Sequence, residues 1–149
     1  MNAHRIAPIE ILLVEDNEGD IFLTKDALSK TNIAHNVHVA INGEVGLNML
    51  KQVGEYSETP LPDIILLDIN LPLVSGIELL DIIKNDDKLK QIPVIMLTSS
   101  TYKKDVTDCY SKHANSYIVK PQQLEDYRNI ATAFEQFWLD VSVLPRAVD

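Results

Sequence analysis

The chain has 149 residues, 46% of them hydrophobic, so it is long enough for one well-filled core and too short for two comfortable domains. Its formal net charge of -9 argues against a nucleic-acid surface, which would need clustered Lys and Arg side chains. Its apolar stretches are far shorter than the ~20 residues of a membrane helix, and its N-terminus lacks a signal-like apolar segment, so we expect a cytoplasmic protein with no membrane contact.

Short apolar runs alternate with segments of helical periodicity along the chain. In chain order, strands are expected at residues 9–14, 36–40, 63–68, 93–97 and 116–119. A helix is expected after each strand, at residues 21–28, 43–53, 75–85, 102–113 and 123–141. Asn17 or Asp20 is the expected cap of the first helix, and Ser75 that of the third. The alternation predicts an α/β fold with an open parallel sheet and right-handed crossovers.

Acidic residues follow two of the expected strands. The third strand is a continuous apolar run, as in a strand covered on both faces, and it ends at Asp68, after which Pro72 prevents it from continuing. Glu15 and Asp16 follow the first strand in the same way. The carboxyl ends of parallel strands share one edge of the sheet, so we expect these three acids to meet there. Carboxylates this close repel one another unless a cation joins them.

The strand ends together supply the parts for phosphoryl chemistry. Mg²⁺ suits convergent carboxylates because it keeps several waters and needs few protein oxygens. Asp68 can then attack phosphorus as a nucleophile. Lys120, after the fifth strand, supplies a fixed positive charge, and the hydroxyl of Thr98, after the fourth, can donate to a phosphoryl oxygen. The chain has no Gly-rich phosphate cradle, so the expected ligand is an acyl phosphate and not a nucleotide.

Four strand-end features of this chain resemble the receiver domain of two-component response regulators, in this order: the acid pair Glu15-Asp16, then Asp68, Thr98 and Lys120-Pro121. The resemblance covers nearly the whole chain, with a receiver domain at residues 9–141, an N-terminal extension at 1–8 and a C-terminal tail at 142–149. It implies a flavodoxin-like fold of three layers, with five helices around five parallel strands in the order 2-1-3-4-5.

The resemblance also implies how the acids act. Asp68 would be the phosphoacceptor, which takes a phosphoryl group from a sensor histidine kinase. Glu15 and Asp16 would bind Mg²⁺ with help from Asp68 and the backbone carbonyl of Asn70. Glu15 stands where many receivers carry Asp, so it would reach the metal through a longer arm. The protein would be a switch that signals by conformational change, and not an enzyme.

Further roles follow from the same resemblance. Thr98 and Lys120 would contact the phosphoryl group. Tyr117, three residues before Lys120, matches the switch aromatic of the family, which turns inward when the threonine moves toward the phosphate. The bond between Lys120 and Pro121 would be a cis peptide, which only proline makes inexpensive.

A finer resemblance concerns the segment Glu15-Asp16-Asn17 with Asp20, and the tail from Phe137-Trp138-Leu139 to Leu144-Pro145. Both are similar to the single-domain receivers that partner bacterial phytochrome histidine kinases. The expected partner is therefore a phytochrome kinase.

Other interpretations remain open. A small Mg²⁺-dependent phosphohydrolase also needs a nucleophilic Asp, but it would normally carry a second acid just after the nucleophile, where this chain has Asn70. A flavodoxin-like cofactor-binding domain would need Gly, Ser or Thr around the phosphate, and acids there would repel it. Taken singly, the loop acids could be helix caps, and Tyr117 could be a packing residue of its strand.

The last expected helix would be ~28 Å long and would extend past the sheet edge that it covers. Its end carries Phe137, Trp138 and Leu139, which point around more than one face. Exposed apolar residues of this kind usually mark an interface, so we expect a two-fold homodimer through the last helix, with these three residues, and its neighbouring strand. The alternative is a tail that folds back onto its own domain.

Overall fold

The computed structural model describes residues 7–145, apart from the side chains of residues 140 and 141. Its strands are β1 (Ile9–Val14), β2 (His35–Ala40), β3 (Ile64–Leu67), β4 (Val94–Thr98) and β5 (Ser116–Val119). Its helices are α1 (Glu18–Ser29), α2 (Gly43–Lys51), α3 (Gly76–Lys84), α4 (Lys103–Ser111) and α5 (Leu124–Phe134). A 3₁₀ turn, η1 (Gly54–Tyr56), follows α2, and a π-helical segment, η2 (Glu135–Val141), continues α5.

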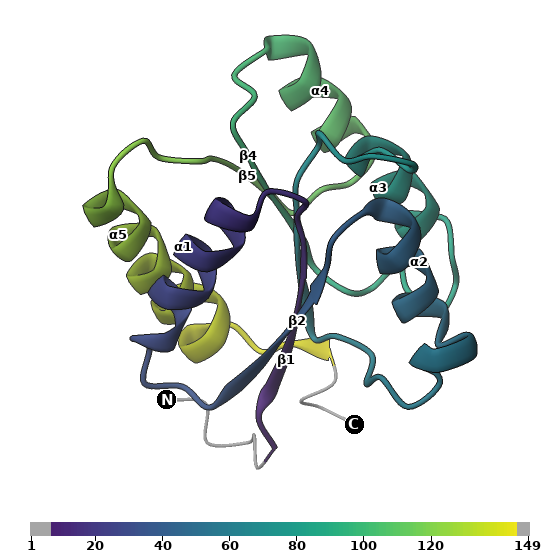
Figure 1. The fold of residues 1–149 in the computed structure, drawn as a ribbon, viewed down its shortest axis with the longest axis horizontal. Helices are drawn as coiled ribbons and strands as arrows, with labels where there is room; N and C mark the ends of the chain where they lie inside the picture. Colours follow the sequence, from purple (N-terminus) through teal and green to yellow (C-terminus); the bar gives the residue numbers. More distant parts are fainter. Residues whose placement is uncertain (1–6, 146–149) are drawn as a thin grey trace.

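The five strands form one parallel sheet in the order β2-β1-β3-β4-β5, which confirms the expected topology. Helices cover both faces, with α1 and α5 on one side and α2, α3 and α4 on the other (Figure 1). The central strands are therefore buried on both faces, and this is why their sequences are continuously apolar instead of alternating.

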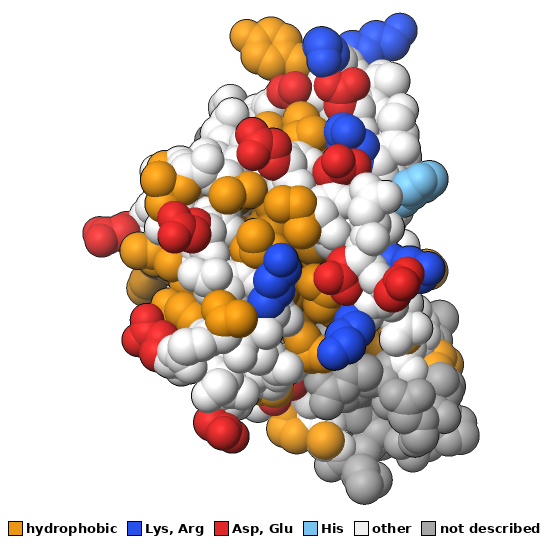
Figure 2. All heavy atoms as spheres, turned by 90° about the vertical axis from the view of Figure 1, so that its right-hand side faces the viewer, with side chains coloured by type: hydrophobic (Ala, Val, Ile, Leu, Met, Phe, Trp, Pro, Cys, Tyr) orange, Lys and Arg blue, Asp and Glu red, His pale blue; other side chains and the backbone are white. Residues whose placement is uncertain are grey.

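Successive residues of each strand point to opposite faces of the sheet and enter two separate cores. On the α2–α3–α4 side the core includes Val14, Leu67 and Met96. On the α1–α5 side it includes Leu13 and Leu66. On the outer surface of the α2–α3–α4 side, acidic and basic side chains lie interspersed around apolar patches (Figure 2).

The helix starts confirm the expected caps and decide between the two candidates for α1. The Asn17 side chain accepts a hydrogen bond of 2.9 Å from the backbone N–H of Asp20, so Asn17 is the cap. The Ser75 hydroxyl accepts a bond of 3.2 Å from the N–H of Glu78 at the start of α3. The carboxylate of Asp20 is thereby left available for another partner.

The end of the chain differs from the single α-helix expected over residues 123–141. The helix widens after Phe134, and the N–H of Ser142 donates to the carbonyl of Phe137 at 2.7 Å, five residues back. The wider turns change which side chains face the sheet: Leu139 is 0% exposed, and Leu144 also packs into the α1–α5 core. The prediction that Leu139 belongs to an exposed interface is therefore wrong, because this residue is a core residue.

Phe137 keeps the exposure that the sequence predicts. Its side chain is 57% exposed, and it meets the half-buried ring of Trp138 edge to face at a centroid distance of 5.3 Å. The end of the chain thus divides into an inward part that folds back onto the domain and one outward aromatic residue.

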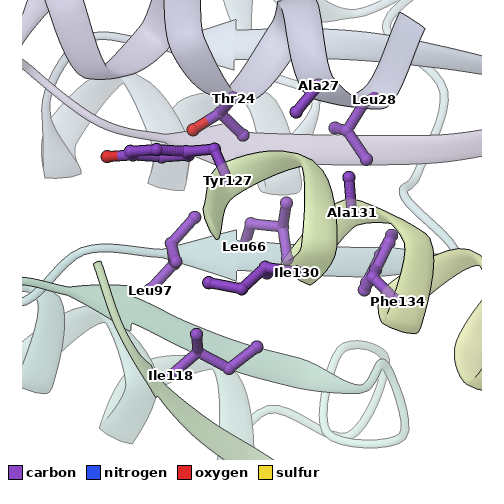
Figure 3. Close-up of a pocket in the computed structure, with 10 residues that line it drawn as sticks. All are labelled: Thr24, Ala27, Leu28, Leu66, Leu97, Ile118, Tyr127, Ile130, Ala131 and Phe134. Carbon is purple, nitrogen blue, oxygen red and sulfur yellow. The ribbon is translucent and has the colours of Figure 1, made fainter. Parts of the chain in front are cut away.

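A small apolar cavity of about 30 Å³ lies between α1, α5 and the sheet. Figure 3 shows its lining, with Leu66 and Ile118 on the sheet side and Ala131 on α5. The Tyr127 ring closes one end and directs its hydroxyl away from the cavity, below Thr24 (Figure 3). Across residues 7–145, we find no helix with the length and apolar character that a membrane crossing requires.

Candidate functional site

Two neighbouring strands deliver the acidic side chains to one edge of the sheet. Glu15 directly follows β1, and its N–H donates to the carbonyl of Ala40 at 3.0 Å; Asp68 follows β3, and its N–H donates to the carbonyl of Val14 at 3.1 Å. Both residues thus continue the pairing of their strands. Gly76 lets α3 begin against the backbone of Asp68, because a Cβ at Gly76 would overlap the Asp68 carbonyl oxygen. The position of Asp68 is therefore fixed from both ends of its loop.

Glu15, Asp16 and Asp68 come together as the sequence predicts. One carboxylate oxygen from each lies within 4.8 Å of the others. Glu15 and Asp68 are 2% and 5% exposed, whereas Asp16 faces solvent. An all-oxygen donor set that is open on one side fits a hard divalent cation, which would keep its remaining ligands as water. The expected contribution of the Asn70 carbonyl stays a prediction; the Asn70 side chain is exposed, and its N–H lies 3.4 Å from Asp68 Oδ1.

Lys120 reaches into this cluster from the end of β5. Its Nζ lies 2.5 Å from Glu15 Oε1, 3.0 Å from Asp68 Oδ2 and 2.8 Å from Asp20 Oδ2. The Lys120 side chain is only 7% exposed, so the three carboxylates replace most of the water that an ammonium group would otherwise hold.

Burial and the hydrogen bonds between Lys120 and the acids shift the pKa values of these groups in opposite directions. Burial raises the pKa of Glu15 to about 7, and the charge of Asp68 adds to this, while the hydrogen bond from Lys120 lowers it. For Lys120, burial lowers the pKa, but the hydrogen bonds to Asp20, Glu15 and Asp68 together raise it above its ordinary value. The lysine therefore stays charged, and the pKa of Glu15 lies near neutral pH.

Thr98 belongs to β4, which pairs with β3, and Tyr117 belongs to β5, the next strand of the sheet. The backbone N–H of Lys120 donates to the Thr98 carbonyl at 2.7 Å, and the buried Thr98 hydroxyl lies 3.4 Å from the N–H of Ser100. The Tyr117 hydroxyl donates to the carbonyl of Ser100 at 2.8 Å. Tyr117 therefore contacts the loop that follows Thr98, and the roles of both residues as a switch stay predictions.

The prediction of a cis peptide bond before Pro121 is wrong. No peptide bond is cis across residues 7–145, so the bond between Lys120 and Pro121 is trans. The ion pairs of Lys120 are made with this isomer, which is the lower in free energy by about 0.5–1 kcal/mol for an X–Pro bond.

Sequence reasoning missed two residues of the site. Asp20 was interpreted as a helix cap, but its carboxylate pairs with Lys120, one hundred positions away. Ser100 received no role, but its hydroxyl donates to Asp105 at 2.5 Å and its carbonyl accepts from Tyr117. The sequence offers both Asn17 and Asp20 as caps of the same helix, and only the structure shows that Asn17 takes that role and leaves Asp20 for Lys120. No signal in the sequence marks Ser100.

The sheet order and the acids at its carboxyl edge define a phosphoacceptor domain of the two-component type. The family model described as the response regulator receiver domain matches residues 11–132, and the chain belongs to this family.

Individual relatives are also similar over nearly their whole length. Response regulator Rcp1 of Synechocystis sp. is 40% identical over 140 residues, which span 94% of this chain and 95% of Rcp1. The crystal structure of Mn²⁺-bound Rcp1 has a TM-score of 0.88 and 40% identity, covering 93% of this chain and 99% of that one. The structure of the phosphorylated cyanobacterial phytochrome response regulator RcpA has a TM-score of 0.90 and 41% identity, with the same coverage.

Proposed function

We propose that this chain accepts a phosphoryl group on Asp68 from the phosphohistidine of a sensor histidine kinase, in a reaction that requires Mg²⁺. The observation that carries the proposal is the contact of buried Asp68 with Lys120, inside a carboxylate cluster that fits a divalent cation. Family membership supports it.

The residues of the site divide the chemistry between them. One Asp68 oxygen attacks phosphorus, the P–N bond of the phosphohistidine breaks, and the imidazole leaves with the electron pair and takes up a proton. A divalent cation held by Glu15, Asp16 and Asp68 would neutralise the phosphoryl oxygens. Lys120 is fixed 3.0 Å from Asp68 Oδ2, where it can pair with the incoming charge, and Thr98 would donate to a phosphoryl oxygen.

The modification then acts as a signal. A phosphorylated Asp68 gives the Thr98 hydroxyl an acceptor, so Thr98 would move toward it and Tyr117 would leave its bond to Ser100. The alternative of a phosphohydrolase lacks support, because exposed Asn70 stands where an acid would protonate the leaving group. We therefore propose a receiver that is not an enzyme, with residues 9–141 as its signalling unit between extensions at 1–8 and 142–149.

The relatives suggest the partner. RcpA is a phytochrome response regulator, and its similarity to this chain extends over nearly the whole length of both. We propose that the kinase is a phytochrome, that both proteins act in the cytoplasm, and that neither nucleic acid nor membrane is a ligand of this chain.

We further propose a homodimer through the outer side of β5, α5 and the segment that follows. Val119, Leu124, Phe137 and Val143 are exposed apolar side chains along this part of the chain. Phe137 and Trp138 remain the proposed contacts, and buried Leu139 no longer belongs to them.

Treatment with acetyl phosphate and Mg²⁺ tests the phosphorylation. Intact-protein mass should show one phosphoryl adduct per chain, which is absent when EDTA is added or when Asp68→Asn is used. Asp16→Asn should reduce the adduct, because Asp16 is a ligand and not the acceptor. An adduct that persists in Asp68→Asn would transfer the acceptor role to another acid, and rapid release of many phosphates per chain would favour the phosphohydrolase.

A further inference from the structure

Asp20 is the carboxylate partner of Lys120 that lies outside the metal-binding cluster. Lys120 Nζ contacts three acids, and two of them, Glu15 and Asp68, are also the acids that a divalent cation would take. Asp20, at 2.8 Å, is the remaining one among the described residues. The ammonium thus has three carboxylate partners. Two of them would also bind the cation, and the third, Asp20, would not.

Metal binding changes the surroundings of Lys120. A cation on Glu15 and Asp68 withdraws negative charge from the lysine and places a second positive charge beside it. The Lys120 side chain is 7% exposed, so it has little access to water with which to replace the lost partners. A buried ammonium without a partner is costly, and this cost opposes the binding of the metal.

Asp20 is held where it can prevent this loss. It lies in the first turn of α1, where its backbone N–H is bonded to the Asn17 cap at 2.9 Å. Thr24, four residues later on the same helix face, lies above the Tyr127 ring in Figure 3. The position of Asp20 is therefore set by α1 and does not depend on Glu15 or Asp68.

We propose that Asp20 is a positioning residue that retains Lys120 when a divalent cation occupies Glu15, Asp16 and Asp68. It promotes metal binding by giving the ammonium a carboxylate partner that the cation does not use, and it keeps the ammonium beside the phosphoryl position. This inference deepens the proposed function and rests on its metal site.

Calorimetric titration of the chelator-treated protein with MgCl₂ alone tests the proposal. Asp20→Asn should raise the Kd for Mg²⁺ by about fivefold or more, and Asp20→Glu, which keeps the carboxylate, should restore most of the affinity. Glu18→Gln is the matched control, since it removes an exposed acid from the same helix turn with no ion pair described to Lys120. Its Kd should stay within about twofold of the wild type.

A Lys120→Met background tests whether Asp20 promotes Mg²⁺ binding through Lys120 or only through its own negative charge. If Asp20 acts through Lys120, adding Asp20→Asn to Lys120→Met should leave the Kd within about twofold of the Lys120→Met value. An equal loss of affinity in both backgrounds, or a loss in Asp20→Asn no larger than that in Glu18→Gln, would overturn the proposal. A wild-type chain that binds no Mg²⁺ would overturn the metal site itself, which is a different result from normal binding that is insensitive to Asp20.

Discussion

Glu15 is the residue in which burial and charge oppose each other most directly. Its side chain is almost fully buried beside Asp68, and its contact with Lys120 only partly offsets the loss of water, so its pKa stands at about 7 in the metal-free protein. A bound cation would favour the charged form. Metal binding above pH 7 then needs no proton release from Glu15, and below pH 7 it does.

This pKa predicts how the stability of the metal-free protein depends on pH. Because the folded state holds the Glu15 proton up to about pH 7 and the unfolded state releases it near 4.5, stability should fall as pH rises through this window. Glu15→Gln cannot titrate, so its free energy of unfolding should lack this component. Urea unfolding in EDTA between about pH 5 and pH 8 measures the difference between the two proteins. Parallel pH curves would contradict the raised pKa.

At the scale of elements, the loop between β4 and α4 depends on Ser100. Tyr102, the residue before α4, makes no side-chain cap, and Cys109 is the buried residue of this helix. Ser100 ties the helix start to the sheet, since its hydroxyl donates to Asp105 and its carbonyl accepts from Tyr117 on β5. The polar contacts of Ser100 thus close the loop that carries the proposed switch.

Ser100→Ala should therefore loosen the start of α4 without unfolding the domain. We expect faster amide hydrogen exchange over residues 102–106, with a loss of global stability of about 0.5–2 kcal/mol, as for a lost helix cap. Ser99→Ala is the control, because Ser99 is exposed and no side-chain bond is described for it. Equal exchange in the two variants would show that Ser100 does not hold the loop.

The other end of α4 carries a local strain that can be removed. His113 has a φ of 73°, and the N–H groups of His113 and Ala114 donate back to Tyr110 and Cys109, the pattern of a Schellman motif. Glycine is the favoured residue at this left-handed position. His113→Gly should stabilise the protein by about 0.5–1 kcal/mol in thermal or urea unfolding, whereas His113→Ala keeps the Cβ and should not. A destabilised glycine variant would mean that the imidazole makes a compensating contact.

The elements differ in how well their sequences specify them. The strands and the first four helices were predicted to within a few residues, because a parallel sheet covered on both faces requires continuous apolar runs and caps mark the helix starts. The end of the last helix was not predicted, because a π-helical segment follows Phe134 and turns Leu139 toward the core, where Leu144 also packs. The apolar period of an α-helix carries no information about such a change of turn.

The same limit applies to the site. Glu15, Asp16, Asp68 and Lys120 could be placed together because strand ends of a parallel sheet share one edge. The pairing of Asp20 with Lys120 could not, since it depends on how α1 lies against the sheet and not on spacing along the chain. Local sequence specifies which groups reach the edge, and packing specifies which of them touch.

At the scale of the whole molecule, the last described residues contribute both to the α1–α5 core, through Leu139, and to the surface, through Phe137. Phe137→Ser should convert the proposed dimer to a monomer in analytical ultracentrifugation with little change in stability, because that side chain is mostly exposed. Leu139→Ala, two residues away, should instead cost about 2–5 kcal/mol of stability, because it opens a cavity in the α1–α5 core. A wild-type protein that already sediments as a monomer would leave Phe137 as a docking residue for another protein.

The cavity under α5 makes the packing of this helix sensitive to hydrostatic pressure. Hydrostatic pressure favours whichever state has the smaller volume, and eliminating a void of this size contributes on the order of 20 mL/mol. The void lies between α5 and the sheet, so compression acts on the seating of that helix. Because α5 carries Tyr127, which lies in the field of Asp20, and leads into Phe137, a change of packing beneath it reaches both the neighbourhood of Lys120 and the proposed dimer surface. This compressible layer therefore lies between the proposed phosphorylation site and the surface through which the protein would pass on the signal.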